Sequence, residues 1–300
     1  MNNNLVNKYI PLVDEVSNKY NYNSNIKHLL YLIIPAFITK YTYKEERLII
    51  NTFKNTRIII SDKKDKNVQA LYSSIPNYTN NNITTTKYIT IQNYENISLI
   101  QLLDNLVHEF NHAINSYNQE TNIKNNILYL RTGLTYATYE LPTLKKINRD
   151  DNYILEEILN TNQTEQVINI IKNYKDQENT SINNTIYAIN NETNQIYTSK
   201  SYYLENLLFK KILENKTFIS TLNNLRLSGN IEDIESWFDN ITGKKNSYNN
   251  IILYLKNIME LEKKLQNQKY FKKFTINKIK DFIVKILEII NIFNNNCIYK

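Results

Sequence analysis

Residues 108–112 read His-Glu-Phe-Asn-His, a pattern whose residue types and spacing suit metal-dependent hydrolysis. Side chains four residues apart on an α-helix project from one face, so the imidazoles of His108 and His112 can bind the same Zn²⁺ ion. Glu109 is turned from His108 by about 100° around the helix, which places its carboxylate beside the metal rather than on it. There it can act as general base toward a zinc-bound water whose pKa is lowered to about 7.

Histidine is rare in this chain, which makes a chance pairing improbable. Of 300 residues, 3 are His, and two of these are His108 and His112. The alternative is a surface pair of histidines with a helical salt bridge, and the low histidine content argues against it. His28, the third, lies in an apolar helical stretch and is expected to be a core or surface residue without a metal role.

The segment Leu106 to Ala113 resembles the active-site helix of the zincin superfamily of metallopeptidases. It shares the apolar pair before the first His and the small residue after the second, and the resemblance covers roughly residues 57–170. It implies an α+β catalytic domain with a small sheet, an active-site helix and a ligand helix, and cleavage of a peptide or protein substrate. In zincins an edge strand beside the active-site helix binds extended substrate, and Lys87 to Gln92 fits that arrangement.

A zincin needs a third protein ligand, and no His follows His112. Resemblance to the gluzincins, whose third ligand is a glutamate, therefore implies a carboxylate on a downstream helix. We expect this ligand to be Glu157, with Glu156 and Glu165 as alternatives on the same helix. The usual gluzincin pattern would put the ligand at Thr161, so the family pattern does not choose among the three glutamates.

Peptide hydrolysis also needs a donor for the developing oxyanion. Tyr136, Tyr139 and Arg131 lie between the two expected zinc helices and carry suitable hydroxyl or guanidinium groups, so they are candidate transition-state stabilisers. Gly133 is one of only 3 glycines in the chain and predicts a tight turn in this segment.

The spacing of apolar residues, together with capping and helix- or strand-breaking residues, predicts the elements that position these side chains. Helical spacing predicts helices in residues 5–50, and Asn96 or Ser98 is expected to cap the helix that carries the motif to about Tyr117. Pro76 is expected to end the second of three strands that precede this helix, at 57–61, 68–75 and 87–92. We expect a hairpin or a loop over 127–139, a helix over 153–174 and a hairpin over 180–200. From 201 the pattern is helical, with long amphipathic helices over 251–265 and 276–292.

The domain organisation expected is a zincin-like domain over residues 1–200 and a helical region over 201–300. The net charge is +7, but the lysines are dispersed, which indicates a solvated surface rather than a nucleic-acid partner. The apolar run Leu29 to Ile38 is too short to span a membrane. With no secretory signal and a single cysteine, Cys297, a cytoplasmic location is expected, with release by another route as the alternative. Oligomeric state is left open.

Three functions are compatible with these patterns. The first is a zinc-dependent peptidase with Glu109 as general base. The second is a catalytically silent protein in which zinc holds the fold together, and the third is a helical interaction module formed by residues 201–300. An intact Glu109 favours the first over the second, because a structural zinc site has no need of a base.

Overall fold

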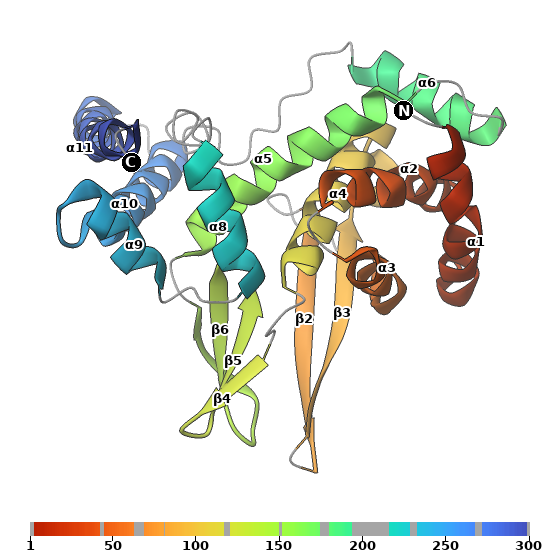
Figure 1. Ribbon diagram of the computed structural model, residues 1–300, viewed down its shortest axis with the longest axis horizontal. Helices are drawn as coiled ribbons and strands as arrows, with labels where there is room; N and C mark the ends of the chain where they lie inside the picture. The colour runs from red at the N-terminus through yellow and green to blue at the C-terminus, as the bar shows by residue number, and fades with distance from the viewer. Residues whose placement is uncertain are drawn as a thin grey trace. The chain divides into compact units, whose positions relative to one another are not determined.

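The protein has an α+β fold that is mostly helical and contains two small sheets (Figure 1). The structure is a computed structural model and describes residues 3–42, 45–62, 69–80, 82–116, 121–149, 152–174, 180–193, 216–228, 233–267 and 272–298. The chain divides into two compact units. The first consists of Met1–Tyr117, Leu141–Leu144 and Asn160–Ser199, and the second of Asn118–Glu140, Lys145–Leu159 and Lys200–Lys300. Within the described ranges, no helix is both long and apolar enough to cross a membrane.

The first unit opens with three helices, as its helical spacing predicts. They are α1 (Asn3–Tyr20), α2 (Ser24–Lys40) and α3 (Glu46–Asn55). Every residue of α2 from Leu29 to Phe37 is buried, so this part of the helix forms the centre of the unit's core. The α3 side chain of Phe53 packs on Phe110 of the motif helix with ring centroids 4.3 Å apart, which ties that helix into the same core.

A three-stranded sheet follows in the order β1-β3-β2, with β1 parallel and β2 antiparallel to β3. Its strands are β1 (Thr56–Ser61), β2 (Ala70–Thr79) and β3 (Asn82–Gln92). The β2–β3 hairpin is long and reaches well past the helices of its own unit (Figure 1). The strand over 87–92, expected at the edge, is the central strand β3, and β2 forms an edge in the described part of the sheet.

Pro76 does not end β2, contrary to the sequence prediction. The strand continues in register through Pro76, which pairs with Thr85. The backbone N–H of Tyr72 donates to Glu109 and not to β3, so the main-chain groups of Tyr72 and of every second residue after it point away from the sheet. Pro76 shares this alternation, so its missing N–H removes no ladder hydrogen bond.

Helix α4 (Leu99–Asn115) carries the motif and begins at a well-formed cap. A short 3-10 turn, η1 (Tyr94–Asn96), leads into it. The Ser98 hydroxyl accepts from the N–H of Gln101, and the Gln101 side chain accepts from the N–H of Ser98, which satisfies two helix-end donors. Ser98, one of the two predicted caps, is therefore the N-cap. Leu103, Leu106 and Phe110 give α4 a buried apolar face.

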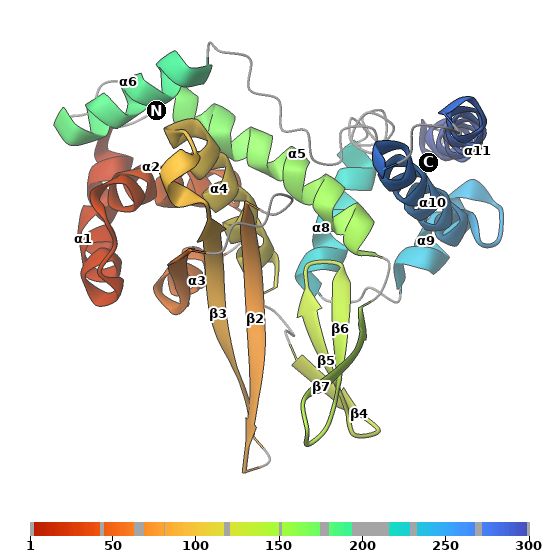
Figure 2. The same ribbon diagram turned by 180° about the vertical axis from the view of Figure 1, so that it is seen from behind.

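The second unit combines a four-stranded antiparallel sheet with helices. The strands lie in sequence order and are β4 (Thr121–Lys124), β5 (Ile127–Thr132), β6 (Thr135–Glu140) and β7 (Lys145–Arg149), visible from behind in Figure 2. The hairpin expected over 127–139 is β5–β6, and it turns at Gly133 in a left-handed conformation with φ +58°. The helices are α8 (Lys216–Ser228), α9 (Asp233–Thr242), α10 (Ser247–Asn267) and α11 (Lys272–Ile298).

Helix α5 (Tyr153–Lys172) contributes to the cores of both units in turn. Ile154 and Ile158 at its start are buried in the core of the second unit, whereas Val167 and Ile171 near its end are buried in the core of the first. Between these apolar ends lies a polar stretch, residues 160–164. The helix predicted over 153–174 is confirmed, and its middle is the part that faces α4.

Helix α6 (Thr180–Thr193) replaces the hairpin expected over 180–200. Ile182, Ile186 and Ile189 follow a helical repeat and are buried in the first unit's core, whereas Tyr187 between them is 70% exposed. Burial of this isoleucine face outweighs the strand preference of its β-branched residues. Residues 194–200 of the expected hairpin, and residues 201–215 at the start of the region expected to be helical, lie outside the described residues.

Candidate metal centre

His108 and His112 lie one turn apart on α4, with ring centroids 5.1 Å apart. His112 is buried and His108 is half-buried. Because the helix is anchored on one side by its apolar residues, both imidazoles are presented from its other side. The Ser116 hydroxyl donates to the carbonyl of His112 at 2.5 Å and closes the end of the same helix.

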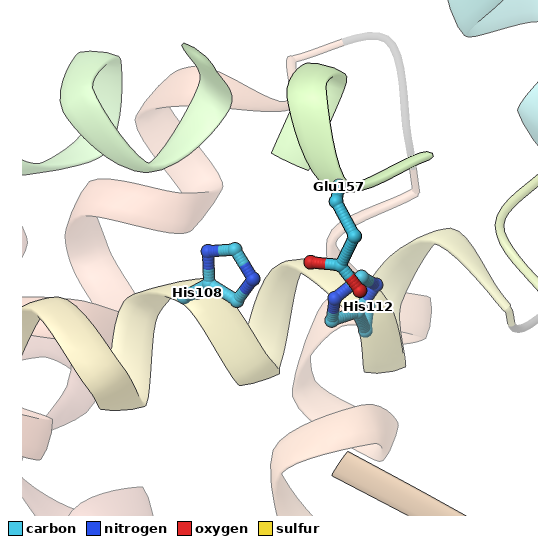
Figure 3. Close-up of side chains that lie close together, drawn as sticks. All are labelled: His108, His112 and Glu157. Atoms are coloured by element: carbon cyan, nitrogen blue, oxygen red, sulfur yellow. The ribbon is translucent and has the colours of Figure 1, made fainter. Parts of the chain in front are cut away.

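Glu157 of α5 completes a group of three potential ligands. One ligand atom each from His108, His112 and Glu157 lies within 4.8 Å of the others, the one such group of three found among the residues that the structure describes. Figure 3 shows the Glu157 carboxylate directed from its helix toward the two imidazoles. In a tetrahedral zinc centre with bonds of about 2.0–2.2 Å, ligand atoms are roughly 3.3–3.6 Å apart, so the donor types and their spacing fit zinc after small side-chain movements.

The two alternative glutamates have other environments. Glu156 is fully buried and forms an ion pair with Arg226 of α8, whose Nε donates to Glu156 Oε2 at 2.9 Å. The N–H of Leu134 also donates to Glu156 Oε2, at 2.8 Å. Glu165 is exposed on α5. Among the three candidate glutamates, the structure thus brings Glu157 to the histidine pair.

Glu109 is buried, 7% exposed, and its carboxylate is held by the edge strand. Its Oε2 accepts a 2.6 Å hydrogen bond from the backbone N–H of Tyr72 on β2. This hydrogen bond fixes the direction of the Glu109 side chain. Glu109 is therefore an ordered carboxylate beside the histidine pair and does not belong to the three-ligand group.

A network of uncharged polar side chains joins α4 to the polar middle of α5. Asn160 Nδ2 donates to the carbonyl of His108 at 2.7 Å, and Asn111 Nδ2 donates to Thr164 Oγ1 at 3.1 Å. Asn115 Nδ2 donates to Gln163 Oε1 at 3.1 Å. The five side chains of this network are at most 4% exposed. Asn111 bonds Thr164 and Asn115 bonds Gln163 side chain to side chain, whereas Asn160 bonds the main chain of His108.

Tyr41, at the end of α2, closes this network from the other side. Its hydroxyl donates to Asn111 Oδ1 at 2.5 Å and lies 2.9 Å from Gln163 Oε1. The neighbouring Lys40 donates to the side chain of Gln166 on α5, and burial lowers the pKa of the Lys40 ammonium. Three helices of the first unit therefore meet at one polar cluster directly next to the motif.

The candidate transition-state stabilisers all lie on the second unit's sheet. Arg131 is fully buried, and its Nη1 donates to the carbonyls of Gly133 and Arg226. Tyr136 packs edge-to-face on Tyr129, with centroids 6.2 Å apart, and Tyr139 is half-buried at the β-bulge of β6. Their role in stabilising an oxyanion stays a prediction.

His28 has the ordinary environment expected of it. It lies half-buried on α2 and stacks on Tyr31, with ring centroids 6.4 Å apart. It does not belong to the three-ligand group.

Two contributions to this site are not apparent from the motif. The hydrogen bond from Tyr72 to Glu109 is made by the backbone N–H of Tyr72, so no pattern of side chains predicts it. Asn160 and Asn111 do carry a signal, because each is a polar residue on a helix face that otherwise meets another helix. Polar pairs of this kind on two helices already expected to share a metal indicate direct hydrogen bonding between the helices.

Comparisons with protein-family models, with curated proteins and with solved structures found no match to this chain.

Proposed function

We propose that this chain is a zinc-dependent peptidase of the zincin type, similar to the gluzincins, with His108, His112 and Glu157 as ligands. The observation that carries the proposal is the convergence of both motif histidines with a glutamate from a second helix. Two imidazoles and one carboxylate are the ligand set of catalytic zinc sites that keep a fourth position open.

Glu109 is the proposed general base. The chemistry that bound zinc supplies is acidification of a water molecule and polarisation of a carbonyl. Glu109 would accept the proton of that water and pass it to the leaving amine, and the Tyr72 N–H would hold the carboxylate in the direction required. A structural zinc site needs no such carboxylate, so its ordered position supports catalysis over a silent site.

Strand β2 supports a peptide as substrate. In the described part of the sheet, β2 pairs on one side only, with β3, and Glu109 contacts its other side at Tyr72. An extended peptide can add to such an edge through main-chain hydrogen bonds, which would bring its backbone next to the base.

The first test is metal content. We expect the wild-type chain to bind about one Zn²⁺ and the His108→Ala/His112→Ala double variant to bind none, because a lone carboxylate is a poor zinc site. Inductively coupled plasma analysis after dialysis against a weak chelator measures this. His28→Ala is the matched control and should keep its zinc. Full occupancy in the double variant would refute the site.

The second test is catalysis. A peptide-library screen of the zinc-loaded wild type identifies a substrate, and Glu109→Gln should then retain zinc and lose at least roughly 10²–10⁴ in rate, because the amide cannot accept the proton. Cleavage by Glu109→Gln at the wild-type rate would exclude this base. Zinc binding with no peptide cleaved in the screen would instead favour the silent zinc protein.

A further inference from the structure

Asn160 is the member of the buried polar network whose side chain donates to the main chain of a proposed ligand. On α5 it follows Glu157 by three residues, so the two side chains lie one turn apart on neighbouring parts of the same helix face. Across the interface its carboxamide donates to the carbonyl of His108 at 2.7 Å. The Asn160 side chain therefore contacts the turn of α4 that carries the two histidines, and it lies one turn from Glu157 on α5.

The acceptor of this hydrogen bond lies within the histidine pair itself. In an α-helix the carbonyl of residue 108 faces the N–H of residue 112, so it belongs to the backbone turn that connects His108 and His112. A carbonyl has two lone pairs and can accept from a second donor. Asn160 thus holds the turn that sets the spacing between the two imidazoles.

The hydrogen bond of Asn160 lies in a fully buried interface between two helices. Asn160 is fully buried, and burying a carboxamide is unfavourable unless it is hydrogen-bonded. An apolar side chain would pack there and would allow α5 to slide or rotate on α4, whereas the Asn160 and Asn111 contacts define one register. Apolar packing alone does not explain why polar residues occupy this helix interface.

We propose that Asn160 is a positioning residue for the metal centre: its carboxamide fixes the register of α5 on α4 and so places Glu157 against His108 and His112. This inference rests on the proposed zinc site but not on peptidase activity. Partners that orient metal ligands typically change metal affinity by about 10–100-fold when removed.

The test compares Asn160→Ala with Asn115→Ala in the full chain. The two asparagines are matched: each is buried, and each donates through Nδ2 to a backbone carbonyl of α4, Asn115 to that of Asn111 at 2.9 Å. Competition with a chromophoric chelator measures the zinc dissociation constant, and unfolding in urea with EDTA measures the stability of the metal-free chain.

We expect both variants to lose stability in EDTA by similar amounts. Asn160→Ala should weaken zinc binding about 10–100-fold. Asn115→Ala should weaken it less than about threefold, since the Asn115 carboxamide bonds Asn111 and Gln163 and neither proposed histidine ligand. The visible spectrum of the Co²⁺-loaded protein should change in Asn160→Ala and match the wild type in Asn115→Ala. Equal zinc affinities for the two variants would show that Asn160 has only a structural role.

If Asn160→Ala does not fold, Asn160→Ser replaces it, because a helical serine bonds its own i−4 carbonyl and leaves that of His108 without the second donor. Failure to cleave any peptide would refute the proposed function and leave the zinc comparison decisive for Asn160. Absence of zinc binding by the wild-type chain would overturn both.

Discussion

Glu156 and Glu157 are neighbours in sequence with opposite surroundings. A step of one residue turns a helix by about 100°, so the two carboxylates leave α5 in different directions. Glu156 is buried against Arg226 and the N–H of Leu134, and Glu157 approaches the histidine pair. Adjacent residues of identical type are therefore expected to act on different properties, one on stability and one on metal binding.

We predict that Glu156→Ala destabilises the protein by about 3–5 kcal/mol, because it leaves the Arg226 guanidinium buried without its counter-charge. Glu157→Ala should leave the metal-free stability nearly unchanged and abolish tight zinc binding. Urea unfolding in EDTA and chelator competition separate the two effects. Exposed Glu165→Ala is the control and should alter neither. Zinc binding by Glu157→Ala with wild-type affinity would contradict the ligand assignment.

Gly133 shows how much of this site the sequence could indicate. Its rarity predicts a tight turn, and the structure confirms one in the left-handed region. What the sequence does not show is that a Cβ at this position would overlap the Glu156 carboxyl. The motif residues were accessible from spacing alone because they lie within one helical turn. Glu156 and Glu157 could not be told apart, since their difference arises from Arg226, about 70 residues away.

At the level of elements, α4 depends on a cap that fixes where it begins. The reciprocal hydrogen bonds of Ser98 and Gln101 satisfy donors that the first turn leaves without helical partners. The cap thus contributes to stability well away from the metal ligands.

We predict that Ser98→Ala lowers the free energy of unfolding by about 0.5–2 kcal/mol, the usual value of an N-cap side chain. Chemical denaturation monitored by circular dichroism measures the change. Asn96→Ala is the control because Asn96 donates to the Asn93 side chain at 2.6 Å and does not cap α4. An equal loss of unfolding free energy in both variants would show that the capping box does not stabilise α4 more than an ordinary surface contact does. Zinc affinity should be unchanged in either.

Elements with a strong periodic pattern were predictable, and those decided by tertiary contacts were not. The helices over 247–267 and 272–298 have long periodic stretches, and both are present. The sequence of helix α6 predicts a hairpin, because its Asn and Thr residues are typical of turns and its β-branched residues are typical of strands. Its buried isoleucines decide the outcome, and their burial depends on neighbours far away in the chain. The same holds for β3, whose central position depends on the strand order.

At the level of the whole molecule, each unit has its own core. The second unit's core is rich in aromatic residues, and Phe218, Phe238 and Phe293 pack together with Trp237. Trp237 is the 1 tryptophan of the chain, so its fluorescence reports on the second unit. The core of the first unit contains Phe53 and no tryptophan.

We predict that Phe218→Ala shifts the unfolding midpoint seen by tryptophan fluorescence downward, since removal of a buried phenylalanine costs about 3–5 kcal/mol. Phe53→Ala, a matched change in the other core, should shift the circular dichroism transition and leave the fluorescence midpoint in place. Metal-free protein is used so that zinc does not influence either unit. Equal shifts of the fluorescence midpoint in both variants would instead identify one cooperative unit.

The contact between Tyr72 and Glu109 has a consequence for self-association. An unpaired strand edge is a template on which another chain can extend the sheet, and proteins usually interrupt such edges. On the outward side of β2, Pro76 offers no N–H, and the N–H of Tyr72 is engaged by Glu109. A second chain approaching this edge would therefore find the row of donors interrupted at these two positions, so the edge suits a short peptide segment better than a long second strand. Replacing Glu109 by Gln preserves an acceptor for the Tyr72 N–H, whereas Ala would release that donor to neighbouring molecules and favour aggregation.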